Sequence, residues 1–580
     1  MRLTLDHFRD SLLTDFGKAT LLDRYVLEGE PPQELFSRVA LAFADNKEHA
    51  QRLYDYISQH WFMPSTPILS NGGTKRGLPI SCFLNETDDS LLGIVNLWNE
   101  NVWLASSGGG IGSYWGNLRG MGETVGQRGE TCGIVPFIKV MDSQTLAISQ
   151  GSLRRGSAAV YIPIHHPEIE EFIDLRRPTG GDPRRKAQDL HHGICIDNKF
   201  MEAVEIDDEY ELLSPKTKQP IKSINARSLW IKLLTTRLET GEPYIIFTDT
   251  VNELRSDIYK RLNLNVKMSN LCSEIMLATG KDYNNMDRTA VCCLSSVNLD
   301  YYDSYKDNEQ FFEDILKFLD NVLTDFINNA PTTMSKATYA AWCERSIGLG
   351  VMGFHSYLQS KGLPFDCAMA KSTNINIFKN ISNKCNKLNI KLGKERGACP
   401  DGLESGIPKR FANVTAIAPT ASISIIAGTT SPGIDPWTAN SFTQKTLSGS
   451  FNVRNPHLVK LLQSKDKDTK EVWSKITRDE GSVQDLNFLT QEEKDLFKTA
   501  LELNPYWIIE HAADRTPYID QSQSVNIWLP ANINKKDLNF VHYLAWKKGL
   551  KSLYYCRSTT IQSADKISKQ ISYEECLSCQ

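Results

Sequence analysis

The chain has 580 residues, of which 41% are hydrophobic and 23% are charged, and its formal net charge is -4. This balance is ordinary for a globular enzyme, and so small a charge gives no long-range attraction for nucleic acid or an anionic membrane. No apolar run approaches the roughly 20 residues that span a bilayer, and residues 1–10 lack the apolar core of a signal peptide. We therefore expect a soluble cytoplasmic protein that binds neither nucleic acid nor membrane.

Three regions follow one another along the chain. Residues 1–60 predict helices, because apolar positions recur at helical spacing and Pro31 and Pro32 mark a helix start. Residues 61–560 alternate strand-like runs, such as 158–164, 191–196 and 243–247, with helices such as 311–330. This alternation favours one large α/β domain with a central sheet. Residues 561–580 are polar and predict a flexible C-terminal tail.

Thirteen cysteines are spread along the chain. An odd count in a large chain without a secretion signal argues against a disulfide framework. We therefore expect most of these cysteines to be buried and to pack as small hydrophobic side chains. The exceptions must be justified by their local sequence context.

The segment SNLCSEI, residues 269–275, carries the first such context. Asn270, Cys272 and Glu274 alternate, so in an extended segment all three side chains would project to the same side. A thiol, an amide and a base would then form a catalytic cluster. By itself the pattern is weak and favours an edge strand with a buried cysteine over a catalytic cluster.

The other cysteine contexts are two strand-like runs and the C-terminus. Cys82 lies in PISCFL, Cys292 lies beside Cys293 in AVCCLSSVNL, and Cys576 and Cys579 form a terminal C-x-x-C. The terminal pair has no second pair nearby, so a redox dithiol is favoured over a zinc site, and no metal site is predicted. The adjacent Tyr554 and Tyr555 could be ordinary aromatic strand residues.

Two glycine-containing segments could bind phosphate. Residues 418–435, APTASISIIAGTTSPGID, are rich in hydroxyl groups and backbone N–H groups and suit an anion, although a polar loop would look the same. Gly348, Gly350 and Gly353 match the dinucleotide fingerprint G-x-G-x-x-G. They lack the strand before it and the acidic residue about 20 positions later. We therefore interpret these glycines as sites of close backbone packing and reject NAD binding.

Taken together and in this order, the motifs from about Trp61 to the C-terminus resemble the large subunit of class I ribonucleotide reductase. The resemblance implies that Cys272 becomes the substrate-attacking thiyl radical, with Asn270 and Glu274 beside it as hydrogen-bond donor and general base. It implies that Cys82 and Cys292 are the reducing pair. By the same resemblance, Tyr554 and Tyr555 relay the radical, and Cys576 and Cys579 form the shuttle dithiol.

The resemblance also implies substrate and effector sites. Asn270 and Glu274 would contact the substrate together with Thr66, Ser81, Gly110, Pro419, Thr420, Ala421, Ser422 and Ile423. A deoxynucleotide or ATP effector would bind across a dimer interface at Asp89, Arg119, Gln150 and Arg154.

The implied fold is a ten-stranded α/β barrel of two five-stranded halves around a central finger loop. The implied enzyme reduces ribonucleoside diphosphates as a homodimer and is re-reduced by thioredoxin or glutaredoxin. No cofactor is expected in this chain, because the radical would come from a metal cofactor in a separate small subunit. A cobalamin-dependent reductase and a non-catalytic regulatory paralogue are the alternatives. Since Cys82 comes so early, we expect no N-terminal ATP-cone and no inhibition by dATP through it.

Overall fold

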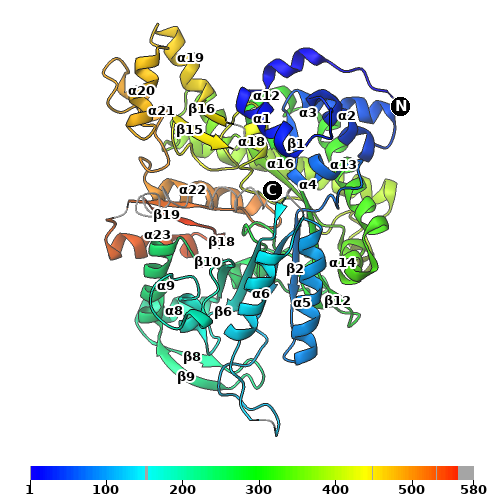
Figure 1. Ribbon diagram of the computed structural model, residues 1–580, viewed down its shortest axis with the longest axis vertical. Coiled ribbons are helices and arrows are strands. Elements are labelled where there is room, and N and C mark those ends of the chain that lie inside the picture. The colour runs from blue at the N-terminus through cyan, green and yellow to red at the C-terminus, as the bar shows by residue number, and fades with distance from the viewer. Residues whose placement is uncertain (1, 128, 151–153, 447–448, 531, 559–580) are drawn as a thin grey trace.

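The computed structural model describes residues 2–127, 129–150, 154–446, 449–530 and 532–558. Its centre is a curled sheet, and five parallel strands form one half of it (Figure 1). Each strand of this half pairs in parallel with the next one along the chain. These strands are β2 (Cys82–Glu86), β3 (Gly110–Tyr114), β6 (Ala158–Pro163), β7 (His191–Ile196) and β10 (Tyr244–Phe247).

A second parallel half runs antiparallel to the first. It begins with β13 (Ala290–Asn298), which pairs antiparallel with β2, and continues with β14 (Ile347–Met352). Residues 413–417 then bond to β14, and residues 522–524 bond to Ile417. The circuit closes through β17 (Ile527–Leu529), β19 (Cys556–Ser558) and β18 (Ser552–Leu553), because β18 pairs antiparallel with β10. Within the described residues, this ring of hydrogen bonds is the expected ten-stranded barrel of two five-stranded halves.

Strand alternation separates the barrel interior from its outer face. On β13, Cys292 and Leu294 belong to the interior apolar cluster, whereas Cys293 belongs to the outer one. The Cys293 thiol accordingly faces the carbonyl of Leu319 in helix α13 (Glu309–Asn329), at 3.7 Å. The interior cluster also holds Cys82 and Cys272, so the barrel encloses Cys82, Cys272 and Cys292 together.

Glycines allow the barrel segments to approach closely. A Cβ on Gly348 would lie 2.4 Å from the Leu294 side chain and 2.9 Å from the Cys292 sulfur, and one on Gly350 would lie 2.5 Å from the Ala416 carbonyl oxygen. Both glycines lie within β14. The packing interpretation of these glycines is therefore confirmed.

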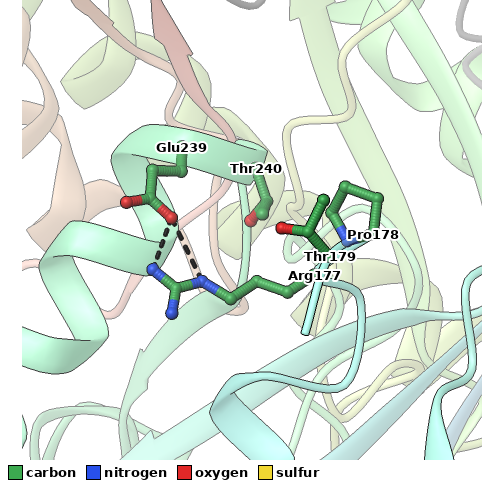
Figure 2. A pocket seen from close by; sticks show the side chains of 5 residues that line it. All are labelled: Arg177, Pro178, Thr179, Glu239 and Thr240. Carbon is green, nitrogen blue, oxygen red and sulfur yellow. Dashed lines mark hydrogen bonds and ion pairs between the residues drawn. The ribbon is translucent and has the colours of Figure 1, made fainter. Parts of the chain in front are cut away.

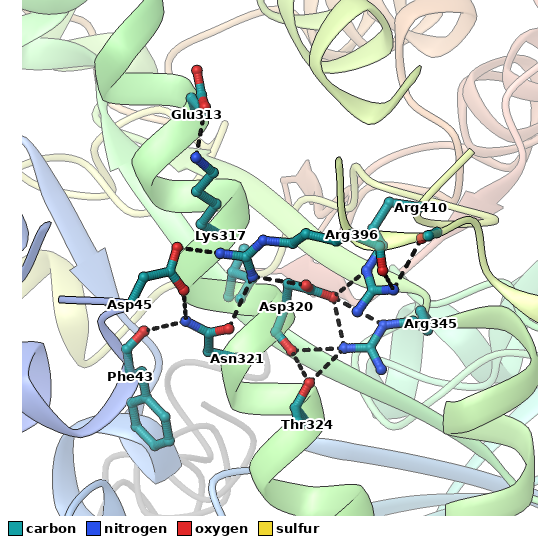
Figure 3. A network of polar contacts seen from close by, with 12 residues as sticks. Phe43, Asp45, Glu313, Lys317, Asp320, Asn321, Thr324, Arg345, Arg396 and Arg410 are labelled. Carbon is teal, nitrogen blue, oxygen red and sulfur yellow. Dashed lines mark hydrogen bonds and ion pairs between the residues drawn. The ribbon is translucent and has the colours of Figure 1, made fainter. Parts of the chain in front are cut away.

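Helices cover the barrel, and a buried charge network joins several of them (Figure 3). Asp320 of α13 accepts hydrogen bonds from Arg345 (2.9 Å), Arg396 (3.0 Å) and Arg410 (2.9 Å). Burial would raise the pKa of Asp320, but the guanidinium groups of Arg345 and Arg410 hold it below its ordinary value. Arg396 also pairs with Asp45, so the network ties the N-terminal region to the barrel helices.

The N-terminal region is helical, as predicted, and a later insertion packs near it. Its helices are α1 (Asp15–Arg24), α2 (Pro32–Phe43), which begins at the predicted proline, and α3 (Lys47–Ser58). The insertion contains the hairpin of β15 (Ser441–Thr446) and β16 (Gly449–Arg454), followed by α19 (Pro456–Ser464), α20 (Lys470–Arg478) and α21 (Gln491–Leu496). It has its own apolar cluster, and Phe451 stacks on Phe16 of α1. None of the helices in the described residues is long and apolar enough to cross a membrane.

Candidate active site

The segment carrying Cys272 passes through the barrel interior and contacts both halves. On the first half, the Tyr161 hydroxyl of β6 donates to the Asn270 carbonyl at 2.5 Å, and Gly112 of β3 faces the Ser269 carbonyl so closely that a Cβ would lie 2.3 Å away. On the second half, the Ser524 hydroxyl donates to the Cys272 carbonyl at 2.6 Å. Residues 269–275 are therefore held between the two halves by hydrogen bonds and close packing, as a central finger loop.

The finger loop is a turn, so the expectation of an extended segment was wrong. The Asn270 side-chain oxygen accepts the backbone N–H groups of Glu274 and Ile275, each at 3.2 Å, and Ser273 has a positive φ of 65°. An Asn side chain that bonds to following backbone N–H groups stabilises a turn in preference to a strand. Asn270, Cys272, Ser273 and Glu274 are all fully buried.

Cys82 and Cys292 stand directly opposite each other on β2 and β13. Opposed residues of an antiparallel pair have Cα atoms about 4.5–5.5 Å apart, which lies within the range that a disulfide needs. Burial and the neighbouring Cys293 and Cys82 raise the pKa of Cys292 well above its ordinary value, so its resting form is the protonated thiol. The Asn270 amide donates to the Cys82 sulfur at 3.2 Å, which joins the finger loop to this pair.

Glu274 and the bottom of the finger loop are held by residues 521–524. The Ser524 hydroxyl lies 3.4 Å from the Glu274 carboxylate, and the Glu274 carbonyl accepts the Ser522 N–H at 2.9 Å. Gln521 accepts the Met276 N–H and points its amide toward the Cys292 sulfur at 4.0 Å. The same short stretch therefore positions the carboxylate, the thiol loop and one cysteine of the pair.

Tyr554 and Tyr555 lie between β18 and β19 with ring centroids 4.2 Å apart. Tyr554 is buried in the barrel, and Tyr555 is only partly buried. Tyr244 of β10 contacts both rings, at 4.9 and 5.2 Å, and Arg557 lies 4.1 Å from the Tyr555 ring centroid. These rings form one contiguous aromatic cluster that extends from the partly buried Tyr555 into the barrel interior.

The residues expected to bind substrate gather at one end of the barrel. Because the halves are antiparallel, the end at which β2 and β3 begin is the end at which residues 413–417 finish. Ser81 and Gly110 are bonded there through their backbones, at 2.9 Å, and the Ser65 hydroxyl contacts that of Ser81 at 3.0 Å. Thr66, Ser81 and Gly110 lie at this end together with Pro419, Thr420, Ala421, Ser422 and Ile423.

The expected effector residues lie at the ends of two adjacent helices, α5 (Leu91–Ser106) and α6 (Val135–Ala147). Asp89 precedes α5 and forms an ion pair with Arg119 at 2.7 Å. Gln150 and Arg154 follow α6 and pair through their backbones in the β4–β5 hairpin (Ser149–Gln150 and Arg154–Arg155). Cys576 and Cys579 lie outside the described residues.

Sequence reasoning missed several neighbours of the candidate site, notably Tyr161, Tyr244, His191, Gln521 and Ser524. Tyr161, Tyr244 and His191 sit in predicted strands, so strand alternation offered a signal for these three, but it offered none for Gln521 and Ser524. A surface cavity of about 430 Å³ is lined by Arg177, Pro178, Thr179, Glu239 and Thr240, none of which is a predicted site residue, and Figure 2 shows Arg177 paired with Glu239 in its wall. Among the described residues, no cluster of His, Cys, Asp and Glu could hold a metal ion.

Comparison with known proteins identifies relatives along nearly the whole chain. A family model described as the all-alpha domain of ribonucleotide reductase matches residues 11–77, and one described as its barrel domain matches 80–405 and 402–556. The ribonucleoside-diphosphate reductase large subunit of Invertebrate iridescent virus 3 is 40% identical over 97% of both chains. The large chain of Schizosaccharomyces pombe is 30% identical over 97% of this chain and 76% of its own length. The class Id ribonucleotide reductase alpha subunit of Actinobacillus ureae superposes with a TM-score of 0.83 at 35% identity, covering 96% of this chain and 98% of that one.

Proposed function

The chain belongs to the ribonucleotide reductase large-subunit family, and we propose that it reduces ribonucleoside diphosphates to 2′-deoxyribonucleoside diphosphates by radical chemistry at Cys272. One observation carries the proposal. The barrel encloses the Cys272 loop together with two cysteines that are paired in register and protected from water. Enclosure of this kind protects a reactive radical from side reactions.

The proposed reaction starts at the ribose. A thiyl radical on Cys272 takes the 3′ hydrogen atom, which leaves a carbon radical at C3′. Glu274 accepts the 3′-OH proton as general base, and Asn270 orients the substrate hydroxyl groups. The protonated thiols of Cys82 and Cys292 then assist loss of the 2′-OH as water.

The two electrons that reduce the substrate come from the cysteine pair. Cys82 and Cys292 give up two hydrogen atoms in total and form one disulfide, while the substrate loses its 2′-OH as water and gains a hydrogen at C2′. Cys272 returns the 3′ hydrogen and recovers its radical. Thiol exchange with Cys576 and Cys579, and then with thioredoxin or glutaredoxin, would restore the dithiol.

The oxidant is proposed to come from a radical-generating small subunit through Tyr555 and Tyr554. Two observations support this route: the two rings are in close contact, and Tyr555 is partly buried whereas Tyr554 is fully buried. The metal cofactor of that subunit would supply the radical, and this chain would hold none. The substrate diphosphate would be bound by backbone and hydroxyl groups of Pro419–Ile423, near Thr66, Ser81 and Gly110.

A homodimer with an effector site is the second part of the proposal. Exposed apolar side chains gather on α5 and α6, which pack side by side (Figure 1). An apolar patch of this kind marks a protein interface. Asp89, Arg119, Gln150 and Arg154 frame these helices and would bind the deoxynucleotide or ATP effector there. The exposed side chains are Leu91 and Leu92 (66% and 70% exposed), Val95, Trp103, Val140 and Leu146.

The proposed reaction is tested by assaying the purified chain with CDP and a dithiol. We expect dCDP only when a small subunit is added, and none when adenosylcobalamin replaces that subunit. Activity with adenosylcobalamin alone would favour the cobalamin-dependent class. Absence of dCDP with every radical source, together with retained effector binding, would favour a regulatory paralogue.

A further inference from the structure

His191 brings a basic ring to the outer tyrosine of the proposed relay. Its Nδ1 atom lies 3.3 Å from the Tyr555 hydroxyl, and the two rings meet edge to face with centroids 6.0 Å apart. His191 begins β7 and is 3% exposed, and its ring also stacks on Tyr244. The imidazole therefore lies inside the aromatic cluster and not at the protein surface.

Two further charged groups contact the same nitrogen. The Arg176 guanidinium lies 2.8 Å from His191 Nδ1, and the Glu242 carboxylate lies 2.5 Å from it. A guanidinium only donates hydrogen bonds, so it requires a bare Nδ1. A carboxylate only accepts, so it requires Nδ1–H. No single protonation state satisfies both partners: Arg176 suits the bare Nδ1, and Glu242 suits Nδ1–H.

Glu242 is suited to stabilise the protonated state. It is 2% exposed, and it is held by Arg176 at 2.9 Å and by the backbone N–H of His192 at 3.1 Å. Burial would raise the pKa of Glu242, but Arg176 and His191 hold it well below its ordinary value. The carboxylate is thus ionised and would stabilise an imidazolium after His191 takes up a proton, whereas Arg176 beside Nδ1 opposes that positive charge before the proton arrives.

The positive charge of Arg557 favours loss of the phenolic proton when Tyr555 is oxidised. The guanidinium lies over the Tyr555 ring, 4.1 Å from its centroid. If Tyr555 lost an electron and kept its proton, a cationic ring would face a second cation. Removing the proton leaves a neutral radical and avoids this repulsion.

We propose that His191 accepts the phenolic proton of Tyr555 when Tyr555 is oxidised, and that Glu242 stabilises the resulting imidazolium. The electron passes to the radical carried by the small subunit, the O–H bond of Tyr555 breaks, and an N–H bond forms at His191 Nδ1. On the return step the proton and electron come back to Tyr555. The inference rests on the proposed function, because it needs a radical that enters through Tyr555.

The first test compares two adjacent histidines that both contact Glu242. His191→Gln keeps a polar group but cannot take up a proton, and we expect the single-turnover rate of dCDP formation to fall about 100-fold, as for loss of a general base. His192→Gln is the matched control, because His192 contacts Glu242 at 3.3 Å and packs on Phe172, away from the tyrosine. We expect its rate to stay within about twofold of the unmodified chain. Binding of the small subunit and of CDP is measured in parallel and should be unchanged in both variants.

The second test is the pH profile, which a merely structural role would not move. The groups around His191 are Arg176, His192, Glu242, Tyr244 and Tyr555, and Arg557 lies beyond on the Tyr555 ring. Acid protonates His191 and removes the acceptor, so the single-turnover rate should fall on the acid side. Glu242→Gln removes the anion that favours imidazolium, so this fall should move to lower pH while the maximal rate drops.

The outcomes separate the inference from the proposed function. If the unmodified chain forms no dCDP with a small subunit, the proposed function fails. If it forms dCDP and His191→Gln matches it in rate and pH profile, only the role of His191 is overturned. Equal losses in His191→Gln and His192→Gln would likewise overturn it, since they would indicate general damage to the Glu242 site.

Discussion

At the scale of single residues, the two neighbouring cysteines of β13 have different environments. Cys292 points into the barrel opposite Cys82, whereas Cys293 points outward to α13. The sequence left open which of the two adjacent thiols takes part in the chemistry. Strand alternation resolves the geometry, because successive side chains must face opposite sides of the sheet.

This difference gives a prediction for turnover without an external reductant. The unmodified chain should end with a Cys82–Cys292 disulfide once the Cys576 and Cys579 dithiol has also been oxidised, because no further electrons are then available to reduce substrate. Cys293→Ser should behave identically, while Cys292→Ser should form no such disulfide and should lose multiple turnover. Peptide mass spectrometry after alkylation measures the pairing. A disulfide that involves Cys293 would contradict the assignment.

At the scale of elements, the finger loop depends on partners that are distant in sequence. Tyr161 of β6 holds the Asn270 carbonyl, and the 521–524 stretch holds the opposite side of the loop. Misplacing a reacting group by about 1 Å costs about 100-fold in rate. The loop must therefore be fixed by the barrel wall before the thiol can react productively.

Removing one such hydrogen bond should lower activity without unfolding the chain. We expect Tyr161→Phe to reduce kcat about tenfold, through loss of one hydrogen bond worth about 1 kcal/mol and a looser loop. Tyr114→Phe on the adjacent strand is the control, since Tyr114 is also buried in the barrel interior but no described hydrogen bond joins it to the loop. Steady-state kinetics with melting temperatures test this. Equal effects of the two variants would argue against a specific role for Tyr161.

Local sequence patterns predicted most of the helices and strands correctly, but they did not predict which distant residues contact one another. The strands at 158–164, 191–196 and 243–247, the helix at 311–330 and the N-terminal helices follow from periodicity. The turn in the finger loop could not be predicted from periodicity, because the alternation of Asn270, Cys272 and Glu274 resembles that of a strand. In the structure the Asn270 side chain accepts a hydrogen bond from the backbone N–H of Glu274, which stabilises the turn. His191 and Gln521 could not be assigned, since their roles depend on register between segments far apart in the chain.

At the scale of the whole molecule, the barrel places the candidate chemistry inside and the candidate regulation outside. The apolar patch on α5 and α6 lies beside the Asp89–Arg119 ion pair, so dimer formation and effector binding are expected to depend on each other. The barrel interior contributes none of these exposed side chains. Changes on this patch should therefore affect regulation before they affect the cysteine chemistry.

A charge placed on the patch tests this arrangement. We expect Leu92→Asp to shift the chain from dimer to monomer in analytical ultracentrifugation and to abolish the effect of deoxynucleotides on substrate choice. Leu403→Asp is the control, because Leu403 is 65% exposed on α17 (Pro400–Glu404), a helix outside the patch. If Leu92→Asp stayed dimeric and effector-responsive, the interface would have to lie elsewhere.

The measurement that tests the central claim most directly is the reduction of CDP by Cys272→Ser in the presence of a small subunit. A serine hydroxyl cannot form the reactive sulfur radical, so we predict that dCDP formation falls to background while the melting temperature and the binding of small subunit and CDP are unchanged. Sustained formation of dCDP by Cys272→Ser would contradict the assignment of Cys272 as the residue that attacks the substrate.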